Sequence, residues 1–399
     1  MRPLLSQSTL LLMALACGLC AGGNYFNQPL LHSISLAFAV SESTAALTVT
    51  VAQVAYAFGL VLLVPLGDKL ERRGLAVTLM LLAAAGQFIS GFAQNMPMLL
   101  TGTLMAGLFS VAAQILVPMA AALSDPKQSG RAVGTVMSGL LIGILAARSV
   151  AGLLSGVGGW NTVYKVAGVI MLVVALLLWL RLPKSRNTQQ SGYLQILASL
   201  ATLVASQPRL RSTSLLGALS FASVSVLFST MALLLAGPQF GLSDVQIGLV
   251  GLIGVAGALM ANVAGRMVDR GWGQRTTAIA LLLLLGSWLL LWLGGNSLIC
   301  FLIGMLAIDM GLQGVHVTNQ NVVYKLIPEA RSRLNAVYMT SYFIGAASGS
   351  ALGTLAWRQG GWTGTCLLGV GLALCAAAAL LYDQRVARRA LQQGSNSPG

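Results

Sequence analysis

Residues 298–325, LICFLIGMLAIDMGLQGVHVTNQNVVYK, are apolar enough to span a bilayer as one helix, yet they include an aspartate, a histidine and several amides. At about 100° per residue, Gln313, His316 and Gln320 fall within roughly 40° of Asp309. At 1.5 Å per residue they form a stripe about 16 Å long. Ionisable groups at bilayer depth cost roughly 2.5–3.5 kcal/mol each and usually line a transport path. The stripe predicts a membrane helix that faces water or protein, and the simpler alternative is a hydrogen-bonded cluster between helices.

The composition extends this interpretation to the whole chain. Of the 399 residues, 56% are hydrophobic and only 8% are charged, against about 25% charged in soluble domains. The net charge of +14 could suggest a nucleic-acid partner, but the basic residues lie between the apolar runs. The five cysteines are scattered through apolar runs, so we expect no disulfide framework and no metal or cofactor. We therefore predict a polytopic membrane protein with no nucleic-acid partner.

Apolar runs of about 20 residues divide the chain into twelve predicted spans. The run after Arg2 continues too far for a signal peptide, so it is predicted to be a retained first helix. The longest polar segment separates six spans from six. The predicted parts are an N-terminal half at 1–181, a cytoplasmic linker at 182–211, a C-terminal half at 212–382 and a cytoplasmic tail at 383–399.

Basic residues are concentrated in every second loop of the predicted topology, on one side of the membrane. All of them except Arg148, Lys165 and Arg358 fall in segments that lie on one side if the N-terminus is cytoplasmic. The positive-inside rule then predicts that both termini lie in the cytoplasm.

The two halves are also related by an internal repeat. At an offset of 202 residues Arg131 matches Arg333 and Gly143 matches Gly345, and at 201 residues Asp68 matches Asp269. Such parallel repeats build alternating-access transporters. Around this matched pair, glycines recur at every fourth residue, at Gly139 and Gly143 in one half and at Gly345, Gly349 and Gly353 in the other. This spacing is expected where helix backbones approach closely.

Two loops carry the most specific motifs, DKLERR at residues 68–73 and GRMVDRGWGQR at 265–275. Both resemble the loop signature of the major facilitator superfamily, although Val64 and Glu71 replace glycines of that signature. The resemblance implies an all-α membrane protein with twelve transmembrane helices in two pseudo-symmetric six-helix halves. Acidic and basic residues in these loops can form a charge-assisted conformational clasp, and a plain positively charged loop is the alternative. The predicted clasp residues are Asp68, Lys69, Arg72, Arg73, Gly265, Asp269 and Arg270.

Proton coupling is expected at Asp309, Arg148 and His316. The fifth and tenth helices are neighbours in the fold that this chain resembles, and Arg148 and Asp309 lie at similar depths, so we hypothesise an ion pair between them. His316 is either a proton relay or a neutral hydrogen-bonding group. Ala147-Arg148 and Thr103 stand where proton-driven exporters of the superfamily usually have Gly-Pro and Arg, so coupling is expected to depend on Asp309.

Uncharged polar residues on three helices suggest a solute cavity. Three of them precede Pro29 within about 100° of one another, and Gln114 occupies the repeat position of His316. Hydrogen bonds between helices are the alternative role for each of them. The predicted cavity residues are Asn24, Tyr25, Asn27, Gln28, Gln114, Gln313, Asn319 and Gln320.

Residues 316–335 and 338–345 resemble bacterial permeases described as arabinose-efflux-like and as exporters. We therefore expect a secondary active transporter, not an enzyme, that exports a small organic molecule by proton-coupled alternating access. The alternative is uptake or facilitated transport of a polar metabolite such as a sugar, and a more remote one is a polytopic sensor or membrane enzyme. The expected partners are a small-molecule substrate, protons and the lipid bilayer, and a monomer suffices.

Overall fold

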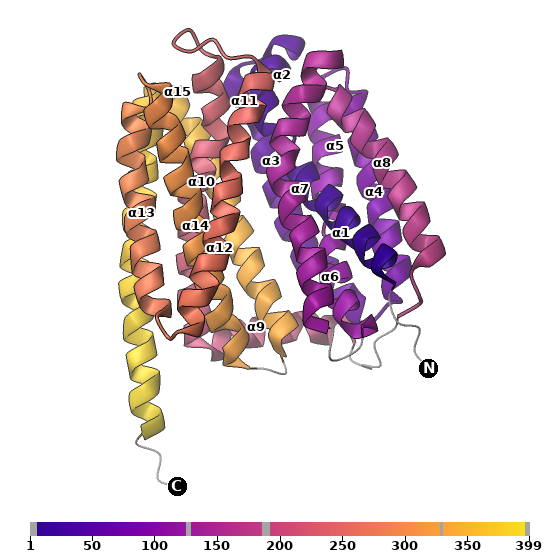
Figure 1. Ribbon diagram of the computed structural model, residues 1–399, viewed down its shortest axis with the longest axis vertical. Helices are drawn as coiled ribbons and strands as arrows, with labels where there is room; N and C mark the ends of the chain where they lie inside the picture. The colour runs from indigo at the N-terminus through magenta and orange to yellow at the C-terminus, as the bar shows by residue number, and fades with distance from the viewer. Residues whose placement is uncertain (1–5, 125–128, 186–191, 328–329, 396–399) are drawn as a thin grey trace. The chain divides into compact units, whose positions relative to one another are not determined.

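The computed structural model describes residues 6–124, 129–185, 192–327 and 330–395, and over these ranges it is built from helices without strands (Figure 1). Ten segments are long and apolar enough to cross a membrane. The last of them, residues 333–389, has non-helical backbone at Gly360 and Gly361 and therefore holds two helices. A broken segment from Asp244 to Asp269, which begins with the shorter apolar helix Asp244–Ile253, is a further candidate crossing. The predicted all-α membrane fold is confirmed.

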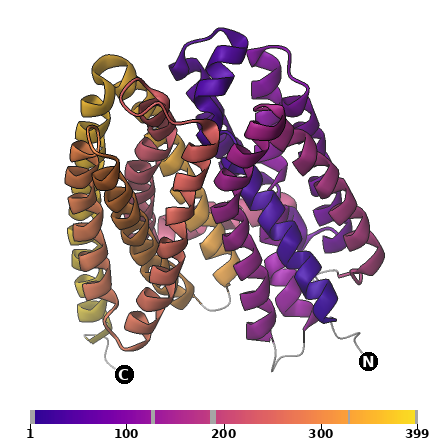
Figure 2. The same cartoon turned by 45° about the horizontal axis from the view of Figure 1, so that its top comes forward.

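The described chain forms two compact units. The first comprises residues 1–196 and 231–252, and the second comprises 197–230 and 253–399. The helices of the first unit (indigo to magenta in Figures 1 and 2, with α11 in orange) are α1 (Gln7–Gly22), α2 (Leu31–Phe38), α3 (Glu42–Leu62), α4 (Arg72–Gly91), α5 (Met96–Phe109), α6 (Ala112–Leu123), α7 (Ser129–Gly158), α8 (Thr162–Arg181) and α11 (Asp244–Val250). Those of the second are most of α10 (Pro208–Ala236), α12 (Gly254–Asp269), α13 (Gly273–Leu293), α14 (Leu298–Leu326) and α15 (Arg331–Ser395).

These units differ from the halves predicted by the sequence in one respect. Residues 231–252 lie in the predicted C-terminal half but pack within the first unit. The predicted linker contains a helix of its own, α9 (Tyr193–Ser206), and the predicted tail begins inside α15. At that point Asp383 accepts hydrogen bonds from Ser212 and Thr213 and pairs with Arg209 at 2.9 Å. The domain boundaries drawn from the sequence stay a prediction.

The first predicted span is not one continuous helix. After α1, the backbone passes through two 3₁₀ turns, η1 (Gly23–Tyr25) and η2 (Gln28–Leu30), before α2 begins. Pro29 has no N–H to continue an α-helical ladder. The Asn24 side chain donates to the Cys20 carbonyl at 3.3 Å and so satisfies an acceptor near the end of α1. This break, residues 23–30, places polar side chains in the interior of the bundle.

Glycines set the distance between α1 and α7. A Cβ added to Gly143 would lie 2.2 Å from the Gly18 carbonyl oxygen, and one added to Gly18 would lie 2.6 Å from the Gly139 carbonyl oxygen. In the second unit a Cβ added to Gly345 would lie 2.1 Å from the Ala218 carbonyl oxygen. No side chain fits at these positions. The close helix packing that was predicted from a glycine at every fourth residue is confirmed.

Glu71 determines where α4 begins. Its carboxylate accepts from the backbone N–H groups of Arg73 at 2.9 Å and Gly74 at 2.8 Å, as a helix cap does, and from the Ser185 N–H at 3.0 Å. Partial burial of the carboxyl opposes ionisation, but these three N–H donors and the nearby Arg73 outweigh it and lower the pKa of Glu71. Glu71 therefore fastens the loop before α4 to the segment after α8.

Gly143→Ala is expected to destabilise the protein, because its methyl group would overlap the α1 backbone. Overpacking of this kind costs about 1–3 kcal/mol. The loss of stability is measured by thermal unfolding in detergent, which is monitored by dye labelling of the buried Cys17 and Cys20 thiols as they become accessible. Gly134→Ala on the same helix is the matched control, since nothing lies within 4 Å of its added Cβ. The control should be neutral or stabilising, and equal losses in both variants would refute this role for Gly143.

Glu71→Ala is expected to lower the free energy of unfolding at neutral pH by about 1 kcal/mol, as the loss of a helix cap does. Folding lowers the pKa of Glu71, so its contribution is complete above the ordinary value of 4.5 and is lost as pH falls through the folded pKa. The difference between wild type and variant should therefore shrink below pH 4.5. The exposed Lys69→Ala is the control, and a pH-independent difference would contradict the assignment.

Candidate functional site

Arg148 lies on α7 with only 4% of its surface exposed. Its Nε donates to Gln28 Oε1 at 2.6 Å, and its guanidinium carbon lies 5.1 Å from the centroid of the Tyr25 ring. A Cβ added to Gly251 would lie 2.9 Å from Arg148 Cβ, so the segment after α11 packs directly on this residue. The structure thus brings together Arg148, predicted for coupling, with Gln28 and Tyr25, predicted for the cavity.

These contacts suit a cation in an apolar environment. A hydrogen bond to a charged group contributes about 1.5–3 kcal/mol, and a desolvated cation–π contact contributes about 2 kcal/mol. Gln28 and Tyr25 both come from the break in the first span, where the backbone turns them inward. The break therefore positions the groups that hold the guanidinium.

Two of the other polar residues predicted for the cavity in the first unit bond to neighbouring helices. Asn24 Nδ2 donates to Ser110 Oγ at 2.9 Å, and Gln114 Nε2 donates to the Tyr56 hydroxyl at 3.1 Å. Asn27 is buried close to Asn24. Asn24 and Gln114 thus make the interhelical hydrogen bonds that the sequence left as an alternative role, and Gln114 remains half-buried.

In the second unit, His316 on α14 lies in an aromatic cluster. Its Nδ1 is 3.1 Å from the Tyr338 hydroxyl, and its ring centroid lies 4.6 Å from that of Tyr342. Tyr342 stacks on Phe221 of α10 at 4.1 Å. A half-buried imidazole among tyrosines offers both a hydrogen-bonding edge and flat apolar faces.

The remaining residues of the predicted α14 stripe differ in burial. Asp309, Gln313 and Gln320 are half-buried, and Gln320 Nε2 lies 4.0 Å from Met339 Sδ. Asn319 is buried and donates to the Thr213 carbonyl on α10 at 3.4 Å. Asn319 thus connects α14 to α10, whereas Asp309, Gln313 and His316 lie on a less enclosed part of α14.

Of the predicted clasp residues of the first loop, Arg73 contacts the end of α8 and Arg72 contacts its own loop. Arg73 donates to the carbonyls of Trp179 at 3.3 Å and Leu182 at 3.2 Å, and its guanidinium lies 4.6 Å from the Trp179 ring. Arg72 donates to the Gly67 carbonyl at 3.1 Å. Basic side chains at a helix C-terminus satisfy its free carbonyls.

The other predicted clasp positions are less informative. Lys69 and Arg270 are exposed, and Gly265 is half-buried. The side chains of Asp68 and Asp269 lie outside the described residues. Within the described ranges, no group of three or more His, Cys, Asp or Glu side chains could hold a metal ion.

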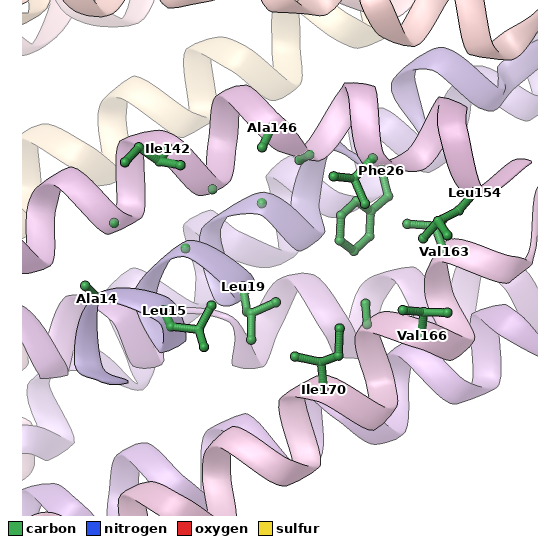
Figure 3. Close-up of a pocket in the computed structure, with 17 residues that line it drawn as sticks. Ala14, Leu15, Leu19, Phe26, Ile142, Ala146, Leu154, Val163, Val166 and Ile170 are labelled. Atoms are coloured by element: carbon green, nitrogen blue, oxygen red, sulfur yellow. The ribbon is translucent and has the colours of Figure 1, made fainter. Parts of the chain in front are cut away.

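Figure 3 shows an apolar groove of about 300 Å³ between α1, α7 and α8. Leu15, Leu19 and Ile142 line it, together with Ile170, and half or more of Leu15 and Ile142 is exposed. Every lining residue is aliphatic, Phe or Gly, so the groove has no side chain to bond a polar solute. None of the predicted site residues belongs to it.

Sequence reasoning missed an acidic residue on α11. Asp244 accepts hydrogen bonds from Ser33 of α2 and, at 2.8 Å, from Ser155 of α7. Nearby, Ser149 Oγ donates to the Gly248 carbonyl at 2.9 Å, and a Cβ on Gly248 would lie 3.0 Å from Gly152 Cα. We term this contact, made by Ser33, Ser155 and Asp244, the α11 latch. The pattern Ser243, Asp244, Gln246 gave only a helix-start signal.

Sequence reasoning also missed Tyr338 and Tyr342 as partners of His316, and Phe221 as a partner of Tyr342. The two tyrosines are four residues apart and so lie on one face of α15, a spacing that could have indicated them. Phe221 comes from another helix and had no local signal.

The chain resembles known families and proteins over nearly its whole length. The family model described as Major Facilitator Superfamily matches residues 13–349 and, in a second match, 213–397. The uncharacterized transporter YgaY of Escherichia coli O157:H7 is 51% identical over 93% of this chain and 94% of its own. A Streptomyces coelicolor protein named "Probable transporter SCO4007" is 32% identical, covering 89% and 83% of the two chains. A Helicobacter pylori (strain G27) protein named "Probable sugar efflux transporter" is 24% identical, covering 83% of each.

Solved structures agree on the fold. A bacterial homologue of the human lysosomal transporter Spinster, in an inward-facing and occupied conformation, has a TM-score of 0.73 at 15% identity, with 96% of each chain covered. The nucleoside transporter NupG has a TM-score of 0.73 at 13% identity, covering 94% of this chain and 99% of its own. At such identities the likeness concerns the fold alone. The family match and the YgaY and SCO4007 relatives together establish that this chain belongs to the Major Facilitator Superfamily of membrane transporters.

Proposed function

We propose that this protein is a secondary active transporter that exports a small polar or amphipathic organic molecule across the bacterial inner membrane, coupled to protons, with both termini cytoplasmic. The observation that carries the proposal is Arg148, a buried guanidinium inside a candidate span that is bonded to Gln28 and faces Tyr25. A charge at that depth is expensive and is typically retained for transport.

The polar surroundings support the proposed solute class. Gln28 and Tyr25 in the first unit, and His316 with Tyr338 and Tyr342 in the second, combine hydrogen-bonding groups with aromatic faces. Sites of this type bind molecules that have both polar groups and apolar surface. The remaining predicted cavity residues are proposed as further contacts to the solute.

Asp309 is the proposed proton carrier. Its carboxyl group lies on a candidate span beside Gln313 and His316 on one helical face. Gain or loss of a proton there changes a membrane-embedded charge, and so changes the relative stability of the two conformations of an alternating-access cycle. The pairing of Asp309 with Arg148 stays a hypothesis from the sequence. The clasp residues are proposed to stabilise one conformation.

A second candidate is uptake or facilitated movement of a polar metabolite. It is favoured by the Gln28 amide at Arg148 and by Asn24 and Asn27 in the same break, since amides suit a sugar-like molecule with several hydroxyls. Among the relatives, one carries sugar efflux in its name and a structural neighbour is a nucleoside transporter. Vesicles separate the two candidates: accumulation in inverted vesicles that a protonophore abolishes supports efflux, and accumulation only in right-side-out vesicles supports uptake.

Asp309→Asn is expected to abolish proton-coupled transport, because the amide keeps the shape of the side chain but cannot carry the proton. Solute-induced proton flux in proteoliposomes should fall by about tenfold or more and lose its dependence on pH. His316→Gln is the comparison, which separates a relay from a neutral hydrogen-bonding role. Transport at the wild-type rate with an unchanged pH profile in Asp309→Asn would disprove this role.

Gln28→Leu is expected to impair transport by removing the acceptor of the Arg148 guanidinium. A hydrogen bond to a charged group contributes about 1.5–3 kcal/mol, so kcat/KM should fall by about tenfold or more. Gln94→Leu, an exposed position outside the candidate spans, is the matched control. Equal kinetics in the two variants would mean that the contact between Gln28 and Arg148 does not serve transport.

A further inference from the structure

A small enclosed cavity lies inside the first unit, separate from the groove of Figure 3. It measures about 10 Å³, the lower limit for one water molecule. Its walls come from the break in the first span and from α3, α4, α5 and α8. The lining residues that carry polar side chains are Asn24, Asn27, Gln87, Ser90, Thr103 and Tyr164.

Three oxygens on this lining are buried without a partner. Asn27 Oδ1, Gln87 Oε1 and the Tyr164 hydroxyl form no hydrogen bond with any described protein group. The three residues are 4%, 2% and 4% exposed. Buried polar atoms are nearly always hydrogen-bonded in native proteins, so three around one cavity indicate a shared partner.

Neighbouring residues position two of these three side chains, those of Tyr164 and Gln87. The Tyr164 ring packs edge-on against Phe26 and Trp160, at centroid distances of 6.2 and 6.1 Å. A Cβ added to Gly23 would lie 2.7 Å from Gln87 Nε2, so the absence of a side chain there lets the Gln87 amide reach the break. These two polar groups of the site are therefore in position before a ligand binds.

We propose that this cavity is a binding site for one water molecule. Water has two donors and two acceptor lone pairs. It can donate to Asn27 Oδ1 and Gln87 Oε1 while it accepts from the Tyr164 hydroxyl, which satisfies all three oxygens. This inference does not depend on the transported solute, which the cavity is too small to hold.

Charge favours water over a small cation. The described lining provides amide and hydroxyl oxygens but no carboxylate. The Arg148 guanidinium lies over Tyr25, only two residues before Asn27, and so adds positive potential on this side of the break. A buried cation without a negative partner is strongly disfavoured.

The water would hold the break in the first span to α4 and α8. Asn27 belongs to the break, Gln87 to α4 and Tyr164 to α8, and none of them bonds directly to another. One molecule with three hydrogen bonds joins all three segments. It therefore helps to maintain the backbone turn that directs Tyr25 and Gln28 toward Arg148.

Tyr164→Phe tests the site by the sign of the change in Tm, because it removes only the hydroxyl. With water bound, the variant loses a hydrogen bond, and Tm in detergent should fall by about 2–4 °C. If the hydroxyl has no partner, its removal relieves a buried unsatisfied group and Tm should stay the same or rise, which would overturn the proposal. Gln87→Met gives the same test with a side chain of similar length.

The double variant tests whether one molecule is shared. If it is, Tyr164→Phe and Gln87→Met should together lower Tm by less than the sum of the single changes. If the two losses in Tm are additive, the proposal that one water molecule is shared would be overturned. Ser225→Ala is the matched control, since this buried hydroxyl of the second unit also has no described partner but does not line the cavity. Its removal should leave Tm unchanged or raised.

Cations and an experimental map complete the test. Tm of the full-length protein in choline, potassium, sodium and lithium chloride at equal ionic strength should be the same. A rise in Tm that is specific to sodium or lithium and absent from Tyr164→Phe would overturn the proposal of a water molecule and indicate a cation.

A density map of the wild type should contain one peak within about 2.6–3.2 Å of all three oxygens, and a map without it would refute the site.

Discussion

The fold depends on close backbone contact between α1 and α7. Lipid tails are as apolar as leucine side chains, so helices in a bilayer gain little from hydrophobic burial and associate through tight packing and hydrogen bonds. Gly18, Gly139 and Gly143 let the two backbones touch. This contact brings the break in the first span close enough to α7 for Gln28 to reach Arg148. The polar site is thus a consequence of glycine packing.

Most of the fold could be predicted from the sequence because its determinants are local. Runs of about 20 apolar residues identify membrane helices, since the thickness of the bilayer fixes their length. The fourfold spacing of Gly139 and Gly143 correctly indicated a close helix contact. The break at residues 23–30 was harder to predict. Pro29 marked it, but a proline alone does not distinguish a kink from two separate 3₁₀ turns.

The site was less predictable because its contacts are not local. Tyr25, Gln28 and Arg148 were each singled out by polarity or charge in an apolar run, yet their mutual contact depends on how α7 packs against the break. Glu71 looked like a departure from a loop motif, and its contact with the distant Ser185 N–H could not be predicted from its local role as the cap of α4. Gln87 and Tyr164 carry no sequence signal of a site, since a single amide or phenol in a membrane helix is common. Their significance comes from burial beside Asn27.

The α11 latch has an energetic consequence for the transport cycle. In the proposed alternating-access cycle, the two halves predicted from the sequence move against each other. Residues 231–252 belong to the predicted C-terminal half while they pack in the first unit. Any movement that carries them away must break the hydrogen bonds from Ser33 and Ser155 to Asp244. At about 1.5–3 kcal/mol for each bond to a charged group, the latch favours its closed state by about two to four powers of ten in population. In the proposed transport cycle, binding of solute or proton offsets this contribution, so the latch raises the binding free energy that turnover requires.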